Sequence, residues 1–364
     1  MCRTEGHINT IWVTAYAGAI CLAANICAAQ DDQTAFPDAA QLTELLDVFD
    51  VPGLAMSTLA DCTPQNVMTV GKADLSTGAD VTRQTAFEAA SLTKPVFAYL
   101  VMTLVQEGLI ILDQPLATRF DYARIADKAA YAQLTPRMIL THRTGLSIWV
   151  DEGTDFHLRS ANIPFTYVPG HQFTYSGEAF QLLQAYIEDQ TGQTFQEIFE
   201  ERLGHVMPHS TLQLPLPESV TPSRGYTSAH DPESGRDMVN LFDVAMAASS
   251  LVTTVDDYTA FLGHVCAGGT LVPELYDEMI RSQSPTPADY LGLEDGQGPV
   301  VSWGLGWMIL DLGGQVMIGH GGNNDEYTAF AGFMRGSGEG IVMLTNGTNG
   351  QELIQTLLMP DVGG

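Results

Sequence analysis

Residues 86–108 read AFEAASLTKPVFAYLVMTLVQEG, with a serine followed three positions later by a lysine at the start of an apolar run. Helical spacing continues from Ser91 to about Glu107, and Gly108 is a natural helix terminator. Two side chains three residues apart lie on the same face of a helix. Ser91 and Lys94 are therefore either a nucleophile with its base or the polar beginning of a core helix.

The catalytic alternative places a specific demand on the lysine. A serine hydroxyl attacks a carbonyl near neutral pH only when a neighbouring base takes its proton. A lysine is that base when burial or nearby positive charge lowers its pKa. The residues that flank Lys94 are apolar, which favours its burial: Ala89, Ala90, Pro95, Val96 and Phe97. The Ser-x-x-Lys pattern also recurs by chance, so it needs support from its structural context.

The composition limits the kinds of partner that the chain can bind. The 364 residues include 43 acidic and 15 basic side chains, a formal charge of −28, and the acidic excess is spread along the chain. Nucleic acids and anionic membrane surfaces repel such a protein, so we expect neither as a partner. The length suffices for a large core, in one domain or in two interleaved ones.

Residues 1–29 are expected to be a signal peptide. Arg3 lies near the start, residues 11–26 are mostly apolar, and Cys27-Ala28-Ala29 offers a cleavage site with small residues. The alternative is an N-terminal anchor that is kept, because Glu5 offsets the charge of Arg3. Export predicts a periplasmic or secreted protein with no stable membrane partner after the signal is removed.

Removal of this segment leaves two cysteines in the mature chain, Cys62 and Cys266. In an oxidising compartment they can form one disulfide. Two separate buried thiols are the other interpretation, since sequence spacing does not show whether the two residues approach each other.

Helical and strand patterns follow one another along the mature chain. A helix is expected at 39–49, followed by two antiparallel strands at 53–62 and 65–74. The middle of the chain favours helices within 134–142, 176–192 and 193–204. Thr254 can cap a helix over 256–265. Four short apolar segments punctuated by glycine then predict strands, and a helix closes the chain: 304–312, 315–320, 327–334, 340–347 and 351–359.

Strands at both ends of the chain, with helices between them, predict a sheet that distant parts of the chain complete. The predicted fold class is α/β, with an antiparallel sheet formed by N- and C-terminal strands, flanked by helices, and an inserted, mostly α-helical lobe. The expected boundaries are 31–110 and 237–360 for the discontinuous α/β domain and 111–236 for the insertion.

Two later segments support a catalytic role for Ser91 and Lys94. Tyr175 precedes a predicted helix, where a phenol can share a proton with a lysine and pass it to a leaving group. His320-Gly321-Gly322 ends an apolar strand, and glycines there allow a substrate to lie along the strand edge. A core aromatic residue and a tight turn are the alternative interpretations.

The order of these segments resembles the serine β-lactamase-like superfamily, which contains class C β-lactamases, D-Ala-D-Ala carboxypeptidases, D-aminopeptidases and related esterases. Its three signatures match Ser91-Leu92-Thr93-Lys94, Tyr175-Ser176-Gly177 and His320-Gly321-Gly322. Four further phrases are similar to this family: LTHRTGLS from Leu140, VPGHQFTYSGEAF from Val168, AASSLVTTVDDYTAFL from Ala247 and GLGWMI from Gly304. The resemblance implies a β-lactamase/transpeptidase-like fold.

The resemblance also implies a role for each matching residue. Ser91 would be acylated, and Lys94 and Tyr175 would handle its proton. The oxyanion would lie between the backbone N–H groups of Ser91 and Asn323, which follows His320-Gly321-Gly322. His320 would face the pocket and contact the substrate or Tyr175. A small molecule or short peptide is the expected substrate, and no metal or cofactor is required.

Two departures from the family pattern change the expected substrate. Gly177 replaces an asparagine whose amide binds the substrate's acylamide in penicillin-binding members, and His320 replaces a charged lysine. Both changes favour an esterase or a peptidase over a true β-lactamase. Arg224, Arg281 or Arg335 could still supply the missing positive charge, and the alternative interpretation of each is an ordinary surface residue. The alternative function is a catalytically silent member that acts as a binding or scaffold protein.

Overall fold

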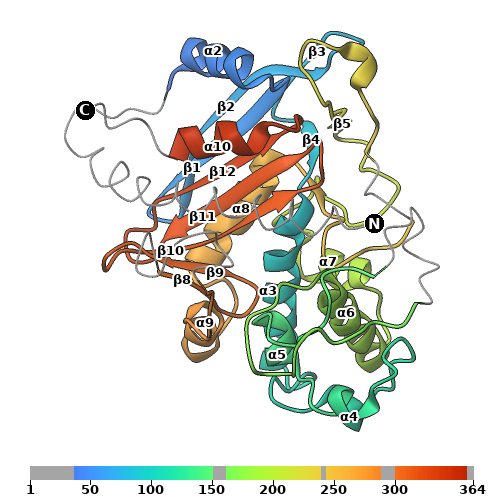
Figure 1. Cartoon of the computed structure of the whole chain (residues 1–364). Helices are drawn as coiled ribbons and strands as arrows, with labels where there is room; N and C mark the ends of the chain where they lie inside the picture. The colour runs from blue at the N-terminus through green and yellow to red at the C-terminus, as the bar shows by residue number, and fades with distance from the viewer. Residues whose placement is uncertain (1–36, 151–160, 239–242, 288–299, 359–364) are drawn as a thin grey trace.

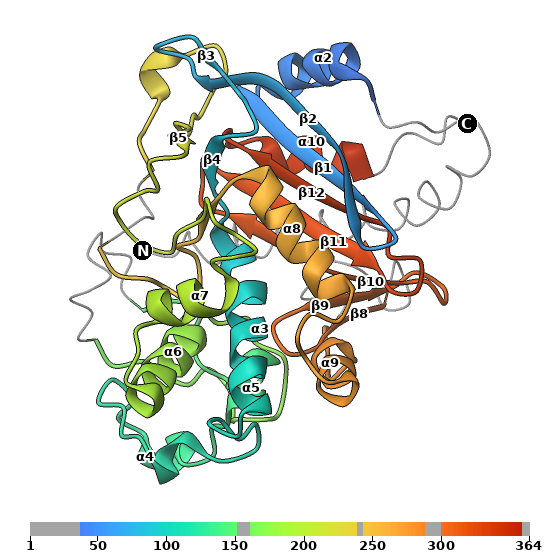
Figure 2. The same cartoon turned by 180° about the vertical axis from the view of Figure 1, so that it is seen from behind.

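The computed structural model describes residues 37–150, 161–238, 243–287 and 300–358. The expected signal peptide, 1–29, lies outside the described residues. Within them the fold is a large antiparallel sheet with helices on both faces and a helical lobe beside it. Helices α2 and α10 cover one face of the sheet (Figure 1), and α8 covers the other (Figure 2).

The sheet joins the two ends of the chain, as the sequence predicts. In the described residues its strand order is β3-β2-β1-β12-β11-β10-β9-β8-β7. Strand β1 lies between its hairpin partner β2 and the C-terminal β12, so Leu54 pairs with both Val70 and Thr345. The strands are β1 Gly53–Ala60, β2 Thr63–Asp74, β3 Ala79–Asp80, β7 Ser284–Pro285, β8 Val300–Trp303, β9 Met308–Asp311, β10 Val316–Asn323, β11 Thr328–Met334 and β12 Gly340–Thr345.

Several helices begin at polar residues whose side chains accept from the free backbone amides of the first turn. The side chains of Asp38, Ser176 and Thr254 cap α2, α6 and α8. The helices are α2 Ala39–Phe49, α3 Thr93–Gln106, α4 Lys128–Tyr131, α5 Pro136–Leu140, α6 Gly177–Thr191, α7 Phe195–Leu203, α8 Val255–Cys266, α9 Pro273–Ile280 and α10 Gly350–Leu358. None of these helices combines the length and hydrophobicity of a membrane span.

Helices α4 to α7 form the helical lobe, and α3 runs between this lobe and the sheet (Figure 1). A second, smaller sheet lies at the N-terminal end of α3. Its central strand β4, Thr85–Glu88, pairs in parallel with β5, Thr221–Pro222, and antiparallel with β6, Val252–Thr253. The segment that leads into Ser91 is thus held from two distant parts of the chain.

The predicted strand at 304–312 was wrong in its first half. Residues 304–307 form the turn between β8 and β9. Gly306 has φ +77°, and a Cβ at this position would lie 2.2 Å from the Cβ of Ala98 in α3. Only glycine permits this backbone conformation and this close approach at low cost. The turn brings the sheet against α3, the helix that carries Lys94.

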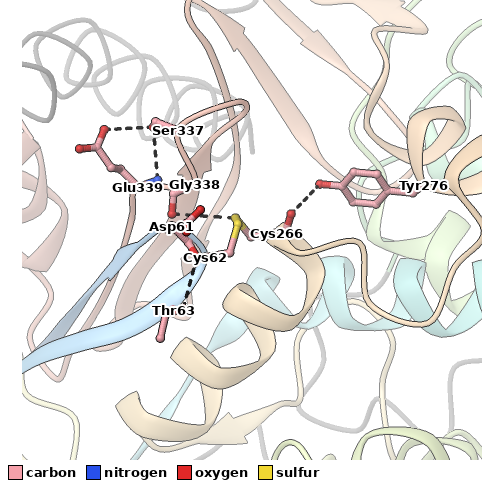
Figure 3. The surroundings of a disulfide bond; sticks show 8 residues. All are labelled: Asp61, Cys62, Thr63, Cys266, Tyr276, Ser337, Gly338 and Glu339. Carbon is pink, nitrogen blue, oxygen red and sulfur yellow. Dashed lines mark hydrogen bonds between the residues drawn. A yellow bond between two sulfur atoms is a disulfide. The ribbon is translucent and has the colours of Figure 1, made fainter.

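Cys62 and Cys266 form a disulfide, which decides between the two alternatives that the sequence left open. It joins the turn between β1 and β2 to the C-terminal end of α8, across a sequence separation of 204 residues (Figure 3). The backbone N–H of Cys62 also donates to the carbonyl of Gly338, 2.8 Å away, in the turn before β12. The bond therefore fastens α8 to the sheet.

We expect the disulfide to contribute about 2–5 kcal/mol to the free energy of unfolding, because a cross-link over a long loop restricts the unfolded chain. Urea unfolding of the wild type, with and without reductant, and of a Cys62→Ser/Cys266→Ser double variant measures this contribution. Reductant should lower the midpoint of the wild type and leave the double variant unchanged. Equal midpoints for all samples would contradict the expectation.

Candidate active site

Ser91 lies in a 3-10 turn, η1 Ala90–Leu92, that leads directly into α3. The preceding Ala90 has φ +49°, an uncommon value for a residue with a side chain, and such strain is concentrated at functional sites. The surrounding structure maintains it: Thr93 Oγ1 donates to the Ala90 carbonyl over 2.6 Å and accepts from the N–H of Leu251 over 3.0 Å. The conformation of the turn is thus held by a segment about 160 residues away in sequence.

Lys94 has the position and the burial that a base for Ser91 requires. Its Nζ lies 3.0 Å from Ser91 Oγ and 2.7 Å from the carbonyl oxygen of Ala248. Only 1% of the residue is exposed, and this burial lowers the pKa of Lys94 to about 7. A substantial fraction of the amine is therefore neutral near pH 7, as a general base requires.

Tyr175 lies two residues before α6 and is buried beside the amine. Lys94 Nζ is 4.8 Å from the centroid of its ring, so the sequence-predicted trio of Ser91, Lys94 and Tyr175 comes together. Aromatic rings surround Tyr175: His142 at 4.3 Å, Trp303 at 5.8 Å and His320 at 6.3 Å between centroids.

Strand β10, which contains His320 and Gly322, passes close to the turn that carries Ser91. A Cβ at Gly322 would lie 2.4 Å from the Ala89 carbonyl oxygen, so the strand can pass this close to the turn only with glycine. His320 is buried, and its Nδ1 lies 2.5 Å from the Gly321 carbonyl, which assigns the ring proton to Nδ1. Burial, and secondarily the Lys94 charge, lower the pKa of His320 to about 3, so its ring is neutral near pH 7.

Asn323 is the last residue of β10 and pairs with Thr328 of β11. Its side-chain Oδ1 accepts from the backbone N–H of Asp325 over 2.9 Å, so the side chain closes the turn that follows the strand. The role of the Asn323 backbone N–H as an oxyanion donor stays a prediction.

Gly177 begins α6, and the space for a side chain at this position is already filled. A Cβ on Gly177 would lie 2.3 Å from Cζ2 of Trp149. The backbone N–H groups of Gly177 and Glu178 donate to the Ile148 carbonyl over 3.1 and 3.2 Å, which holds the Trp149 segment against the helix. An indole ring therefore lies where the family pattern has an amide side chain.

The three arginines considered as substitutes for the missing lysine are engaged elsewhere. Arg224 pairs with Asp237, Arg281 with Glu278, and Arg335 with Asp277. Each of the three guanidinium groups therefore has a carboxylate partner of its own.

Sequence reasoning missed the contribution of the backbone at Ala248. Its carbonyl accepts from Lys94, while its N–H donates to the side chain of Gln181 over 3.2 Å. Gln184, on the next turn of α6, accepts from the N–H of Ala247 over 2.7 Å. The position of such a carbonyl depends on tertiary structure, and its only sequence signal is the similarity of the phrase AASSLVTT to the family.

A family model described as Beta-lactamase matches residues 39–357 of the chain. The chain belongs to the beta-lactamase family. The match extends from α2 to α10 and includes every residue of the site described above. This confirms the superfamily and the fold class that the sequence predicts.

Individual members of the family support the same assignment. Penicillin-binding protein 4 of Amycolatopsis lactamdurans is 25% identical over 314 residues, which cover 82% of this chain and 81% of that protein. Esterase EstB of Burkholderia gladioli is 33% identical over 146 residues, 34% of this chain and 37% of that protein. The crystal structure of D-amino acid amidase from Ochrobactrum anthropi with L-phenylalanine amide has the same fold, with a TM-score of 0.69 at 22% identity over 87% of this chain and 96% of that one.

Replacing Lys94 is expected to abolish acylation of Ser91 while the protein stays folded. Loss of a general base costs about 100- to 10,000-fold in rate. Lys94→Met is the better variant, because a linear apolar side chain fills the buried volume, whereas Lys94→Ala leaves a cavity. The rate of labelling by a fluorophosphonate probe measures acylation, and far-UV circular dichroism monitors the fold. Wild-type labelling rates in both variants would show that another group is the base.

Proposed function

We propose that this protein is a serine hydrolase that cleaves a small ester, an amide or a D-amino-acid peptide through an acyl-enzyme on Ser91. The observation that carries the proposal is the 3.0 Å approach of Ser91 Oγ to a fully buried lysine whose pKa is lowered to about 7. Burial lets the lysine act as a base near neutrality, and the strained turn at Ala90 presents the hydroxyl.

The geometry supports a specific sequence of proton transfers. A neutral Lys94 that donates one N–H to the Ala248 carbonyl keeps its lone pair for the Ser91 hydroxyl. The serine oxygen bonds to the substrate carbonyl carbon as its proton passes to Lys94. Collapse of the tetrahedral intermediate breaks the bond to the leaving group, which takes a proton from Lys94 by way of Tyr175. Water then attacks the acyl carbon as it gives a proton to Lys94, the bond between that carbon and Ser91 Oγ breaks, and the proton passes from Lys94 to Ser91 Oγ as the acid leaves.

The surroundings of the nucleophile favour ester or peptide hydrolysis over β-lactamase activity. A neutral His320 supplies no fixed positive charge for a substrate carboxylate, and Arg224, Arg281 and Arg335 are paired elsewhere. Trp149 fills the space of an amide side chain at Gly177 with an apolar ring. The partial match to esterase EstB supports the ester, and the likeness to D-amino acid amidase keeps the amide among the candidates.

The proposed site of action is the periplasm or the medium outside the cell. The Cys62–Cys266 disulfide supports this, because disulfides persist in oxidising compartments and are rare in the cytosol. A small molecule or short peptide is the proposed partner, and none of the chemistry calls for a metal or cofactor.

A fluorophosphonate probe distinguishes the enzyme from a silent family member. Incubation of the full chain with the probe, followed by proteolysis and mass spectrometry, should place the adduct on Ser91. Ser91→Ala is the matched control, since it removes only the hydroxyl. A folded wild-type protein that takes up no label on Ser91 would contradict the proposed function.

A substrate panel tests the preference among reactions. We expect measurable hydrolysis of short-chain p-nitrophenyl esters and weak or absent turnover of a chromogenic cephalosporin, because His320 is neutral near pH 7 and Arg224, Arg281 and Arg335 are paired with carboxylates. D-Ala-D-Ala peptides and D-amino-acid amides complete the panel and identify any amide activity. Faster turnover of the cephalosporin than of every ester would overturn this ranking.

A further inference from the structure

His142 contacts three consecutive residues centred on Tyr175. It follows α5, its carbonyl accepts from the N–H of Thr174 over 2.7 Å, and its Nδ1 accepts from the N–H of Ser176 over 3.3 Å. Its ring stacks on that of Tyr175, with 4.3 Å between centroids and 25° between planes. One residue thus holds the backbone on both sides of Tyr175 and packs against its ring.

The burial and the backbone conformation of His142 are unfavourable for the stability of the fold. The residue is fully buried and has φ +53°, a conformation that side chains rarely adopt. Burial, with Lys94 and His320 nearby, holds the pKa of His142 well below its usual value, so the ring is neutral. Because Nδ1 accepts, the proton is on Nε2, which is buried and has no hydrogen-bond partner among the described residues. Such a strained polar residue in a core suggests a functional constraint.

The constraint is the orientation of the phenol. Lys94 Nζ lies 4.8 Å from the centroid of the Tyr175 ring, so a rotation about χ1, which swings the whole ring, changes the distance from the hydroxyl to the amine and to Ser91. His142 opposes such a rotation through face-to-face contact, and Trp303 packs edge-on against His142 at 4.8 Å between centroids. The arrangement fixes the His142 ring in turn.

We propose that His142 is a positioning residue that holds Tyr175 in the orientation needed to pass the proton between Lys94 and the leaving group. His142 does not touch the substrate. It acts through Tyr175, and its contribution should disappear when the phenol is absent. This inference rests on the proposed function, since it assigns a supporting role at the same site.

A double-mutant cycle of His142→Asn and Tyr175→Phe tests the inference. Asparagine tolerates a positive φ and offers an acceptor for the Ser176 amide, but it has no ring to stack on Tyr175. We expect His142→Asn to lower kcat for a p-nitrophenyl ester by about 10- to 100-fold with little change in KM, because small misplacements of a catalytic group have effects of this size. In the Tyr175→Phe background the same substitution should change kcat by less than about twofold.

Equal losses of kcat in the two backgrounds would overturn the proposal, since they would show a structural effect independent of the phenol. An unchanged kcat in His142→Asn would overturn it as well. His142→Gln, which also lacks the aromatic ring, replaces the asparagine variant if that protein does not fold. Thermal unfolding of each variant confirms that the comparison is made between folded proteins.

His264 provides the matched control. Its ring contacts Tyr99 at 5.5 Å between centroids, and Nε2 lies 2.9 Å from the Tyr99 hydroxyl, near the disulfide end of α8. His264→Asn removes a similar ring contact away from Ser91 and should leave kcat unchanged. Labelling of wild-type Ser91 by the fluorophosphonate tests the proposed function separately from the role of His142. If Ser91 takes up no label, the proposed function fails. If Ser91 is labelled but the effects of the His142 and Tyr175 substitutions are independent, only the role of His142 is rejected.

Discussion

The buried amine of Lys94 is the constraint on which the rest of the structure depends. An amine with 1% exposure loses hydration, and the fold offers it two partners, Ser91 Oγ and the Ala248 carbonyl. Incomplete compensation for the lost water lowers its pKa to about 7, the property that the proposed general base requires. The backbone N–H of Ala248 in turn donates to Gln181 of α6, so the helical lobe helps to position the residue whose carbonyl accepts from Lys94.

Distant parts of the chain meet at this amine because glycine and small residues permit close backbone approach. Gly322 lets β10 pass against the turn before Ser91, and Gly306 lets the β8–β9 turn pack on α3. On the other side, the hydroxyl of Tyr258 in α8 donates to the Leu92 carbonyl over 3.0 Å. The same helix ends at the disulfide, so α8 connects the cross-link to the segment that contains Ser91.

Local patterns predicted much of this arrangement. The β1–β2 hairpin, the Thr254 cap of α8 and the chain order of Ser91, Tyr175 and His320 could all be read from neighbouring residues. Features that depend on contacts between residues far apart in the sequence could not be predicted. Residues 304–307 form a turn but have the apolar composition of a strand. The Ala248 carbonyl that accepts from Lys94 is a backbone group, so no side chain marks it in the sequence. Trp149 covers Gly177 although the two residues are 28 positions apart. The stacking of His142 on Tyr175 likewise depends on the folded structure.

The pH dependence of Ser91 acylation by a fluorophosphonate tests the central claim most directly, because only the neutral form of Lys94 can accept the serine proton. With a pKa lowered from 10.5 to about 7, the rate should rise roughly tenfold per pH unit from pH 5 toward 7 and level off above it. The Lys94→Met variant should be slow throughout and lack this inflection. A wild-type rate that continues to rise toward pH 10, or one that is flat from pH 5 to 9, would contradict the account.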